Sequence, residues 1–472
     1  MPGRRVLTLA LLLALPAAAQ ATVRLLAIGQ LDAHRRDLST ATAAPLENGV
    51  PGNRLGGLGS AIDQVGCGEF VALPDRGPNA VEFDRAIDNT TSYINRIQTL
   101  EMALQPAPAG APLPFTLRVS LRATTLLSSR EPLAYGSGHG LGVGDGTPAA
   151  NQPGRRYYFT GRSDGYDPAQ PSSWPGDGRL DPESVRVSRD GRSVFVGEEY
   201  GPRIMRFDRG SGVRQQVYAL PAALAVAHPQ PRGHAEDQVN RSGRVGNHGI
   251  EGLALTPDGT VLYAALQGPL LQDGGKHGGY TRILRIDLAT GAVRQFAYPL
   301  SRIGGRAHKP HFTGISDIVA IDGDSLLVDE RDNSGLGSGT VARFKQVFRV
   351  DFAHARPLGD RQGQAALAVV ALHKRPFLDV VAALTRHGVD AADIPAKLEG
   401  LSFGPDVRWR GRLLHTLYIS SDNDFLADLH DRLHPDGIDN PNRFYVFGFT
   451  ETDLPGFSPA AHPACAAGQA RG

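Results

Sequence analysis

Residues 247–269, NHGIEGLALTPDGTVLYAALQGP, decide the fold of this 472-residue chain. After Glu251 and Gly252, apolar residues alternate with other residues, as they do in a half-buried strand. The Pro-Asp-Gly sequence at 257–259 is typical of a tight turn, and a second apolar strand begins at Val261. The stretch therefore predicts a β-hairpin.

Similar hairpins recur along the chain, and two further strands follow most of them. The five repeats have their first strands predicted at 55–58, 181–185, 250–255, 314–318 and 398–401. Their second strands are predicted at 69–73, 193–197, 261–264, 325–328 and 414–420. The third and fourth strands include 95–104, 115–127, 203–208, 213–220, 281–288, 292–298, 346–352 and 366–373. Apolar residues at helical spacing predict a short helix near 377–386.

The last repeat has only three strands, the third at 443–449, whereas residues 23–31 form an isolated strand near the N-terminus. A ring in which the N-terminal strand completes the last blade leaves no open sheet edge. Repeats of four antiparallel strands over about 50 residues are typical of propeller blades. We therefore predict an all-β protein, a β-propeller of four-stranded antiparallel blades with five clear repeats. A Gly/Pro-rich insertion at about 131–180 leaves room for a sixth.

The N-terminus has the features of a secretory signal peptide. Arg4 and Arg5 precede an apolar run at 6–15, and small residues follow it. We predict cleavage after Ala21, with Ala19 as the alternative site, and one propeller domain at 22–472. An uncleaved anchor is the other interpretation, but the run is shorter than the about 20 residues of a membrane span. We expect the mature protein in the periplasm or outside the cell.

The charge balance limits the classes of partner, and the two cysteines indicate the redox compartment. The 49 Lys and Arg residues nearly balance the 48 Asp and Glu residues, for a net charge of +1. Such a balance gives no electrostatic footprint for nucleic acid or an anionic membrane, and we expect a monomer without either partner. Cys67 and Cys465 are predicted to form a disulfide in an oxidising compartment, with two unlinked thiols as the alternative.

Acidic residues occupy two repeated positions in the predicted blades. In a propeller, the first strand of each blade lines the channel, and its start lies beside the end of the second strand. Gly56, Ser316 and Gln267 stand at matching positions that lack a carboxylate. One mouth of the channel is therefore predicted to gather Asp75, Glu183, Glu199 (or its neighbour Glu198), Glu251, Glu330, Glu399 and Asp422.

Carboxylates that are brought together need a positive counter-charge. Ca²⁺ binds six to eight oxygens from such side chains, so we predict that these residues hold calcium. Ion pairs with Arg76, Arg331 or Arg203 are the alternative, and a third interpretation is that each Glu caps N–H groups of the next blade.

The same mouth carries the candidate catalytic residues. Arg76 and Arg331 each follow an acidic residue at a strand end, and a guanidinium binds phosphate or carboxylate oxygens in two places. Both are predicted to bind an anionic substrate, together with Asn423. His248 lies three residues before Glu251, and we predict that the two take part in proton transfer, His248 otherwise being a metal ligand or a surface histidine.

Several segments resemble a known family. They are LGGLGSAI, FVALPDRGPN, DPESVRVSRDGRSVFVGEEYGPRIMRFD, GIEGLALTPDG and KLEGLSFGP, which together span nearly the whole mature chain. This pattern is similar to the phytase-like family of bacterial secreted proteins, described as having esterase-like activity of phytase. The resemblance implies a β-propeller and phosphoester hydrolysis.

The leading hypothesis is an exported metal-dependent hydrolase with a small anionic substrate such as a phosphate ester. A calcium-dependent lactonase or carboxylic esterase is the first alternative. The second is a propeller that binds a ligand at its acidic mouth without catalysis.

Overall fold

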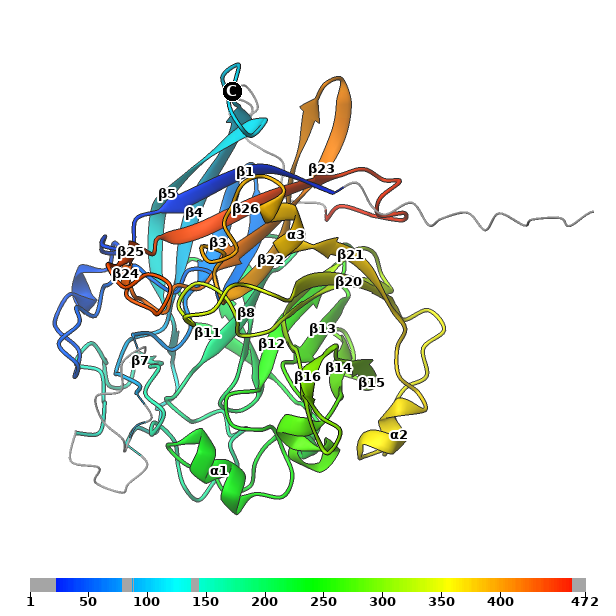
Figure 1. The fold of residues 1–472 in the computed structure, drawn as a ribbon. Coiled ribbons are helices and arrows are strands. Elements are labelled where there is room, and N and C mark those ends of the chain that lie inside the picture. The colour runs from blue at the N-terminus through cyan, green and yellow to red at the C-terminus, as the bar shows by residue number, and fades with distance from the viewer. Residues whose placement is uncertain (1–22, 79–86, 88, 137–143, 461–472) are drawn as a thin grey trace, which may run out of the picture.

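The computed structural model describes residues 23–78, 87, 89–136 and 144–460, and five four-stranded antiparallel sheets dominate it (Figure 1). Blade 1 consists of β2 (Ala61–Gly66), β3 (Glu69–Leu73), β4 (Arg96–Pro106) and β5 (Phe115–Leu126). Blade 2 consists of β8 (Pro182–Val187), β9 (Ser193–Glu198), β10 (Arg203–Asp208) and β11 (Arg214–Tyr218). Blade 3 consists of β12 (Ile250–Leu255), β13 (Val261–Leu266), β14 (Tyr280–Asp287) and β15 (Val293–Pro299). Blade 4 consists of β18 (Gly314–Ala320), β19 (Ser325–Arg331), β20 (Lys345–Asp351) and β21 (Lys374–Asp379).

The ring is closed by the N-terminal strand, as predicted. Blade 5 contains β22 (Leu398–Trp409), β23 (Arg412–Ser421), β26 (Asn442–Phe449) and β1 (Arg24–Leu31). β1 runs antiparallel to β26, from Arg24 opposite Gly448 to Leu31 opposite Asn442, and Figure 1 shows the two strands side by side. The first strands β2, β8, β12, β18 and β22 contact one another in a closed ring. The five-bladed propeller is therefore confirmed.

The apolar core lies between the blades rather than in one central mass. Each of the five large clusters of buried apolar side chains joins two neighbouring blades, and together they join every pair around the ring. Ile250 and Leu266 of blade 3, for example, pack with Ile204 of blade 2. This arrangement is expected of sheets stacked face to face, because both faces of each blade then bury apolar side chains.

Two predicted strands and one helix differ from the structure. Residues 55–58 do not form the first strand of blade 1, because Gly57 has a φ of +64°, which strand residues do not adopt, and Phe425 packs on Gly56 and Gly57. Residues 366–373 are not a strand either, since helix α2 (Gln364–Ala368) occupies part of them. The predicted helix at 377–386 is shorter, α3 (Val380–Thr385), because its first residues belong to β21.

The insertion at 131–180 contributes no blade in its described part. It contains the two-residue strand β7 (Tyr157–Tyr158), which pairs with β6 (Ser128–Ser129). Cys67 takes part in a disulfide, as predicted, and the expected partner Cys465 lies outside the described residues. The predicted signal peptide also lies outside them. In the described part of the chain, no helix is long and apolar enough to cross a membrane.

A β-bulge marks the start of the first strand in four blades. The pairing register shifts between Pro182 and Ser184 in blade 2, and between Ile250 and Gly252 in blade 3. Equivalent shifts follow Ile315 in blade 4 and Leu398 in blade 5. A bulge inserts an extra residue and redirects its side chain. The residues at these bulges are Glu183, Glu251, Ser316 and Glu399.

The middle of the channel is closed by one arginine. Arg186, from β8, donates from Nη1 to the carbonyl of Ile62 at 3.1 Å, and from Nη2 to the carbonyl of Leu401 at 3.0 Å. Nη2 also lies 3.0 and 2.9 Å from the two carboxylate oxygens of Asp317. The guanidinium therefore contacts blades 1, 4 and 5 from blade 2, across the axis of the ring.

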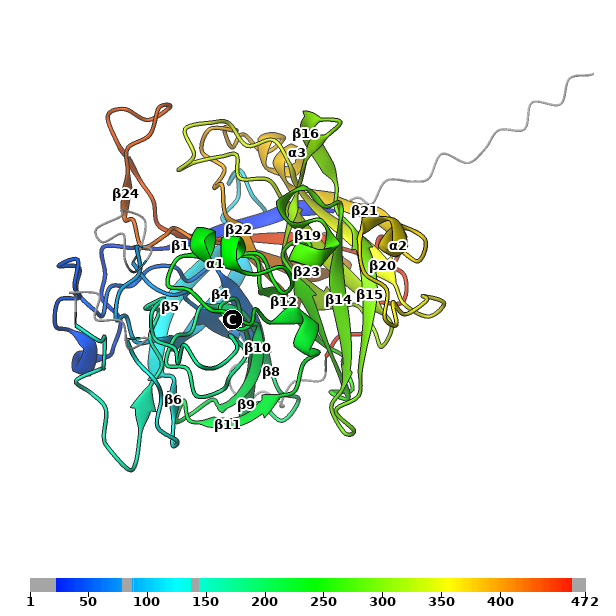
Figure 2. The same ribbon diagram turned by 90° about the horizontal axis from the view of Figure 1, so that it is seen from below.

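Long connections rise around the mouth at which the first strands begin. They include helix α1 (Gly233–Val239), the hairpin β16 (Arg302–Arg306) with β17 (Lys309–Phe312), and β24 (Asp428–Leu429) with β25 (Ile438–Asp439). Figure 2 shows the β16 and β24 hairpins standing out on the same side of the ring. Short 3-10 turns complete the rim and the outer connections: Thr40–Thr42, Ala222–Leu224, Leu271–Asp273 and Gly275–His277.

A candidate active site at the channel mouth

Eight carboxylates and three cations meet at this mouth, and we call them the mouth cluster. The carboxylates are Asp75, Asp181, Glu183, Glu199, Glu251, Glu399, Asp422 and Asp424. The cations that form ion pairs within the cluster are Arg76, Arg331 and Lys397. Glu183 and Asp424 are partly exposed, whereas the other carboxylates are buried. The cluster therefore carries an excess of negative charge in a largely desolvated place.

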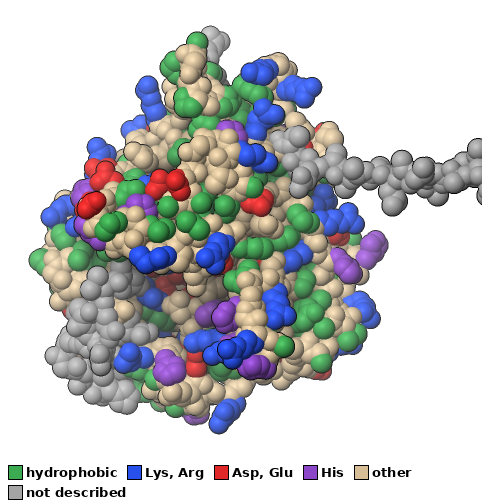
Figure 3. Space-filling model, viewed as in Figure 1, with side chains coloured by type: hydrophobic (Ala, Val, Ile, Leu, Met, Phe, Trp, Pro, Cys, Tyr) green, Lys and Arg blue, Asp and Glu red, His purple; other side chains and the backbone are tan. Residues whose placement is uncertain are grey.

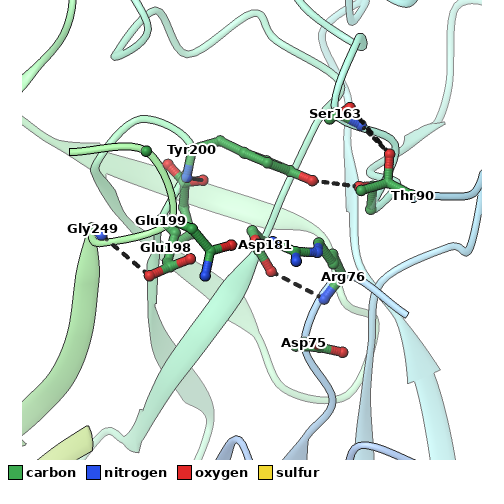
Figure 4. Close-up of polar contacts among 12 residues, drawn as sticks. Asp75, Arg76, Thr90, Ser163, Asp181, Glu198, Glu199, Tyr200 and Gly249 are labelled. Carbon is green, nitrogen blue, oxygen red and sulfur yellow. Dashed lines mark hydrogen bonds and ion pairs between the residues drawn. The ribbon is translucent and has the colours of Figure 1, made fainter. Parts of the chain in front are cut away.

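The contacts between blades 1 and 2 pair an arginine with an aspartate (Figure 4). Arg76 Nη1 lies 2.7 Å from Asp181 Oδ2, and the backbone N–H of Arg76 donates to Asp181 Oδ1 at 3.1 Å. Arg76 also donates to the side chain of Asn247. The arginine side chain is 21% exposed, so it can still meet a ligand at the mouth.

The contacts between blades 4 and 5 repeat this arrangement. Arg331 Nη2 lies 2.5 Å from Glu399 Oε1, and Nη1 donates to Asn333 Oδ1 at 2.7 Å. Arg331 Nε is buried and has no hydrogen-bond partner among the described residues. Within blade 5, Lys397 Nζ contacts Asp422 at 3.0 Å and Asp424 at 2.6 Å.

Between blades 2 and 3, two carboxyl groups meet instead. Glu199 Oε1 accepts from the Gly249 N–H at 3.2 Å (Figure 4), and Glu251 Oε1 accepts from the Gln267 amide. The other oxygen of each carboxyl is buried without a donor in the described part of the chain. The two groups are within hydrogen-bond reach of each other. A proton or a cation must lie between them, because two ionised carboxylates would repel each other.

Burial and mutual repulsion raise several pKa values in the mouth cluster. Burial, followed by the charge of Asp181, raises the pKa of Glu199 to about 7. Burial and the charges of Glu199 and Glu399 raise the pKa of Glu251 well above its ordinary range. Burial and neighbouring carboxylates do the same to the pKa of Asp75 and of Glu183. These groups would hold protons near neutral pH unless a cation replaced them.

The donor set fits a hard divalent cation. One oxygen from each of Asp75, Asp181 and Glu183 lies within 4.8 Å of the others, and so does one from each of Asp75, Asp422 and Asp424. Lys397 lies against two carboxylates of the second group, Asp422 and Asp424. Arg76 pairs with only one carboxylate of the first group, Asp181, so the first group keeps more uncompensated carboxylates for a cation. Hard cations such as Ca²⁺ take oxygen ligands from carboxylates in flexible geometry.

His248 lines a cavity together with Gln267 and Gly268. Its Nδ1 is 3.0 Å from the carbonyl of Gly246, which can accept a hydrogen bond from it. Desolvation lowers the pKa of the ring, so the neutral imidazole is the stable form near neutral pH. With Nδ1–H as the donor, Nε2 remains an acceptor of protons.

Two predicted site residues lie away from the cluster. Glu330 is directed between blades, where it accepts from Tyr298 Oη at 2.5 Å and Thr313 Oγ1 at 2.6 Å, and pairs with Lys374. Asn423 accepts from the Gly57 N–H at 2.8 Å and donates to the carbonyl of Asn440 at 2.9 Å, which secures loops. Glu198 likewise turns inward and pairs with Arg203 at 2.8 Å, whereas its neighbour Glu199 reaches the mouth.

Three residues of the cluster were missed in the sequence. Asp181 and Lys397 each stand two residues before a bulge glutamate, in Asp-Pro-Glu and Lys-Leu-Glu. That shared spacing is the signal that could have found them. Asp424 has a φ of +52°, and its position depends on a loop conformation that no periodicity predicts.

The family of the chain follows from its sequence as a whole. The model of the phytase-like family, described as "Esterase-like activity of phytase", matches residues 53–425. The chain belongs to this family. An uncharacterized secreted protein of Arthroderma benhamiae is 29% identical over 280 residues, which cover 50% of each protein. The chain thus spans about half the length of this relative.

Solved structures resemble the chain only distantly. A periplasmic gluconolactonase of Pseudomonas aeruginosa is 14% identical with a TM-score of 0.30, over 81% of this chain and 86% of that one. The hydrazine synthase of Kuenenia stuttgartiensis is 11% identical with a TM-score of 0.31, over 78% of each. The five-bladed fold is established by the strand topology described above.

Proposed function

We propose that the protein is an exported, metal-dependent hydrolase that acts on phosphate esters. The observation that carries this proposal is the contact between Glu199 and Glu251, whose inner oxygens are buried without donors. Arg76 and Arg331, each in an ion pair at a neighbouring contact between blades, would be the anion-binding groups. Burying polar atoms without a hydrogen-bond partner costs free energy, so these two carboxylate oxygens favour a site that binds a proton or a cation.

Asp75, Asp181 and Glu183 would hold the cation, with Glu199 and Glu251 next to it. When bound there, Ca²⁺ would polarise phosphoryl oxygens and lower the pKa of a water molecule. The all-oxygen donor set and the excess of carboxylates support calcium over softer metals.

The chain's own residues would supply orientation and proton transfer. The guanidinium groups of Arg76 and Arg331 suit the binding of two or more phosphate oxygens, because their planar donors match that geometry. Glu199 and Glu251 together would hold one proton, so that the ionised member accepts a proton from water and the neutral member gives one to the leaving alcohol. Neutral His248, which lines the adjoining cavity with Gln267, would serve as a second proton carrier.

Export to the periplasm or the medium is supported by the signal-like N-terminus and by the secreted relative. The substrate would be a small anionic ester, and the protein a monomer without nucleic-acid or membrane partners.

The test is elemental analysis of the purified mature protein together with assays on phosphate esters, lactones and aryl acetates, before and after treatment with EDTA. We expect bound calcium and phosphate-ester hydrolysis that EDTA abolishes and calcium restores. Metal-loaded protein that cleaves only lactones or aryl acetates would replace the proposal with the esterase alternative. Metal binding without any hydrolysis would make the protein a binding module.

A further inference from the structure

A cavity of about 260 Å³ adjoins the mouth cluster between blades 3 and 4. Gln267 and Arg331 line it, and the same two side chains contact Glu251 and Glu399 of the cluster. Figure 3 shows this face of the molecule hollowed near its middle, with His, Lys and Arg side chains along the edge. The cavity and the candidate active site therefore share a wall.

Part of the cavity wall is apolar. Leu300, Ile303 and Phe312 line it, the last two from the β16–β17 hairpin. The ring of Phe312 rests on Gly279, where an added Cβ would lie only 2.8 Å from the ring. Ile303 is 40% exposed, so the apolar wall continues to the opening. Pockets with apolar walls and a few fixed polar groups are typical of small-molecule sites.

Ser316 provides a polar group without a use in the fold. It stands at the bulge of blade 4, at the position that Glu251 occupies in blade 3. Its residue is 1% exposed, it lines the cavity, and its Oγ has no hydrogen-bond partner among the described residues. A buried hydroxyl without a partner is costly, and a ligand atom that donates to it or accepts from it removes that cost.

We infer that this cavity binds the alcohol part of the ester and selects a flat, aromatic alcohol. The inference rests on the proposed function, because Arg331 would hold the phosphate and also lines the cavity. An apolar cavity of about 150 Å³ takes up benzene, so 260 Å³ suffices for a substituted ring or two fused rings. Ser316 would hydrogen-bond the ester oxygen or a polar substituent near it.

The experiment has a binding arm and a turnover arm, both with the full-length, metal-loaded protein. Titration calorimetry measures the affinity for 1-naphthol, and steady-state kinetics compare 1-naphthyl phosphate with methyl phosphate. We expect a preference of at least tenfold in kcat/KM for the naphthyl ester. Phe312→Ala and the more exposed Ile303→Ala are each expected to lower this preference and the 1-naphthol affinity at least fivefold.

Phe403→Ala is the matched control. Phe403 is also partly buried and lines a cavity of similar size, about 270 Å³, at the opposite end of the channel. This variant should keep the naphthol affinity. Ser316→Ala should weaken 1-naphthol binding several-fold without lowering the Tm, since no described group loses a hydrogen bond. A lower Tm with unchanged binding would make Ser316 structural and overturn its assignment.

The two arms separate this inference from the proposed function. Binding of 1-naphthol that depends on Phe312, without hydrolysis of either ester, keeps the cavity assignment and removes phosphoesterase activity. Hydrolysis of both esters at equal kcat/KM keeps the activity and overturns the cavity assignment. Loss of naphthol binding in Phe403→Ala alone would move the site to the opposite end of the channel and overturn it as well.

Discussion

Two contacts between blades occupy the same structural position and carry opposite chemistry. Arg331 lies opposite Gly314, two residues before the bulge residue Ser316 of the same blade. Glu199 lies in the equivalent place in blade 2, because its N–H donates to the carbonyl of Asp181, two residues before the bulge residue Glu183. Arg331 reaches Glu399 at the bulge of the next blade, whereas Glu199 reaches Glu251 at the bulge of the next blade. One contact is an ion pair and the other is two acids.

The difference lies in how each contact balances its charges. The ion pair between Arg331 and Glu399 satisfies its own charges and joins blades 4 and 5. The contact between Glu199 and Glu251 has the same scaffold but stores unbalanced negative charge, which burial makes more costly. The residue at this repeated position, arginine or glutamate, therefore decides whether the contact is a balanced ion pair or two acids that need a proton or a cation between them.

The largest effect is expected when the acid pair loses its charge. Glu251→Gln keeps the shape of the side chain but removes the shared proton site, so kcat/KM for phosphate esters should fall by about 10²–10⁴-fold. Enzyme kinetics measure it, with Glu101→Gln on the exposed part of blade 1 as the matched control. Equal activity of the two variants would show that the acid pair has no part in the reaction.

The ion-pair contact should respond in stability instead. Glu399→Leu leaves the buried Arg331 without its carboxylate, and we expect a loss of about 3–5 kcal/mol in the free energy of unfolding, measured with urea. The double variant Arg331→Met, Glu399→Leu should recover most of it. Glu251→Leu in metal-free protein should cost much less, since no cation loses its partner. A similar loss in both single variants would remove the distinction between the contacts.

Metal binding at the contact between Glu199 and Glu251 should stabilise the folded protein. Calcium at 100 times its Kd is expected to raise the free energy of unfolding by about 2.7 kcal/mol. Thermal unfolding with and without EDTA measures this effect. Glu251→Gln should reduce it, and Glu101→Gln should not. A calcium effect that is equal in both variants would place the ion elsewhere.

A pH slope is also expected in the metal-free protein. The pKa of Glu199 is raised from 4.5 to about 7, so the folded state keeps a proton that the unfolded chain releases above pH 4.5. Stability should then fall as the pH rises from about 4.5 to about 7, by about 1.4 kcal/mol per pH unit for each such proton. Urea unfolding across this range tests it. Glu199→Gln should flatten the slope, and an unchanged slope would assign the proton to another group.

The sequence was sufficient for the architecture because each blade repeats a hairpin with its own turn. The alternation in 247–269 and the missing fourth strand of the last repeat together predicted a ring closed by β1. Blade 1 misled the prediction. Its Leu-Gly-Gly-Leu copies the pattern Leu-Glu-Gly-Leu at Leu398, but the two glycines accommodate Phe425 instead of forming a strand.

The candidate site was predicted in outline, and its errors follow strand geometry. Neighbouring residues on a strand point to opposite faces. An error of one residue therefore assigns a side chain to the channel mouth when it lies in the interior between blades. Glu330 and Glu198 both fall on the interior side, one residue before Arg331 and Glu199. The bulges add to the difficulty, because they change the register where the key carboxylates stand. Which carboxylates lack partners depends on contacts between distant blades, which no local pattern contains.

The guanidinium of Arg186 has a consequence for traffic through the molecule. It bonds to carbonyls of three other blades across the axis, so we expect the channel to be open at its two ends but not through its middle. In the proposed phosphoesterase, substrate and product would use the same entrance, so a product anion bound at Arg76 or Arg331 would block the next substrate. Inorganic phosphate should accordingly inhibit by direct competition with the ester.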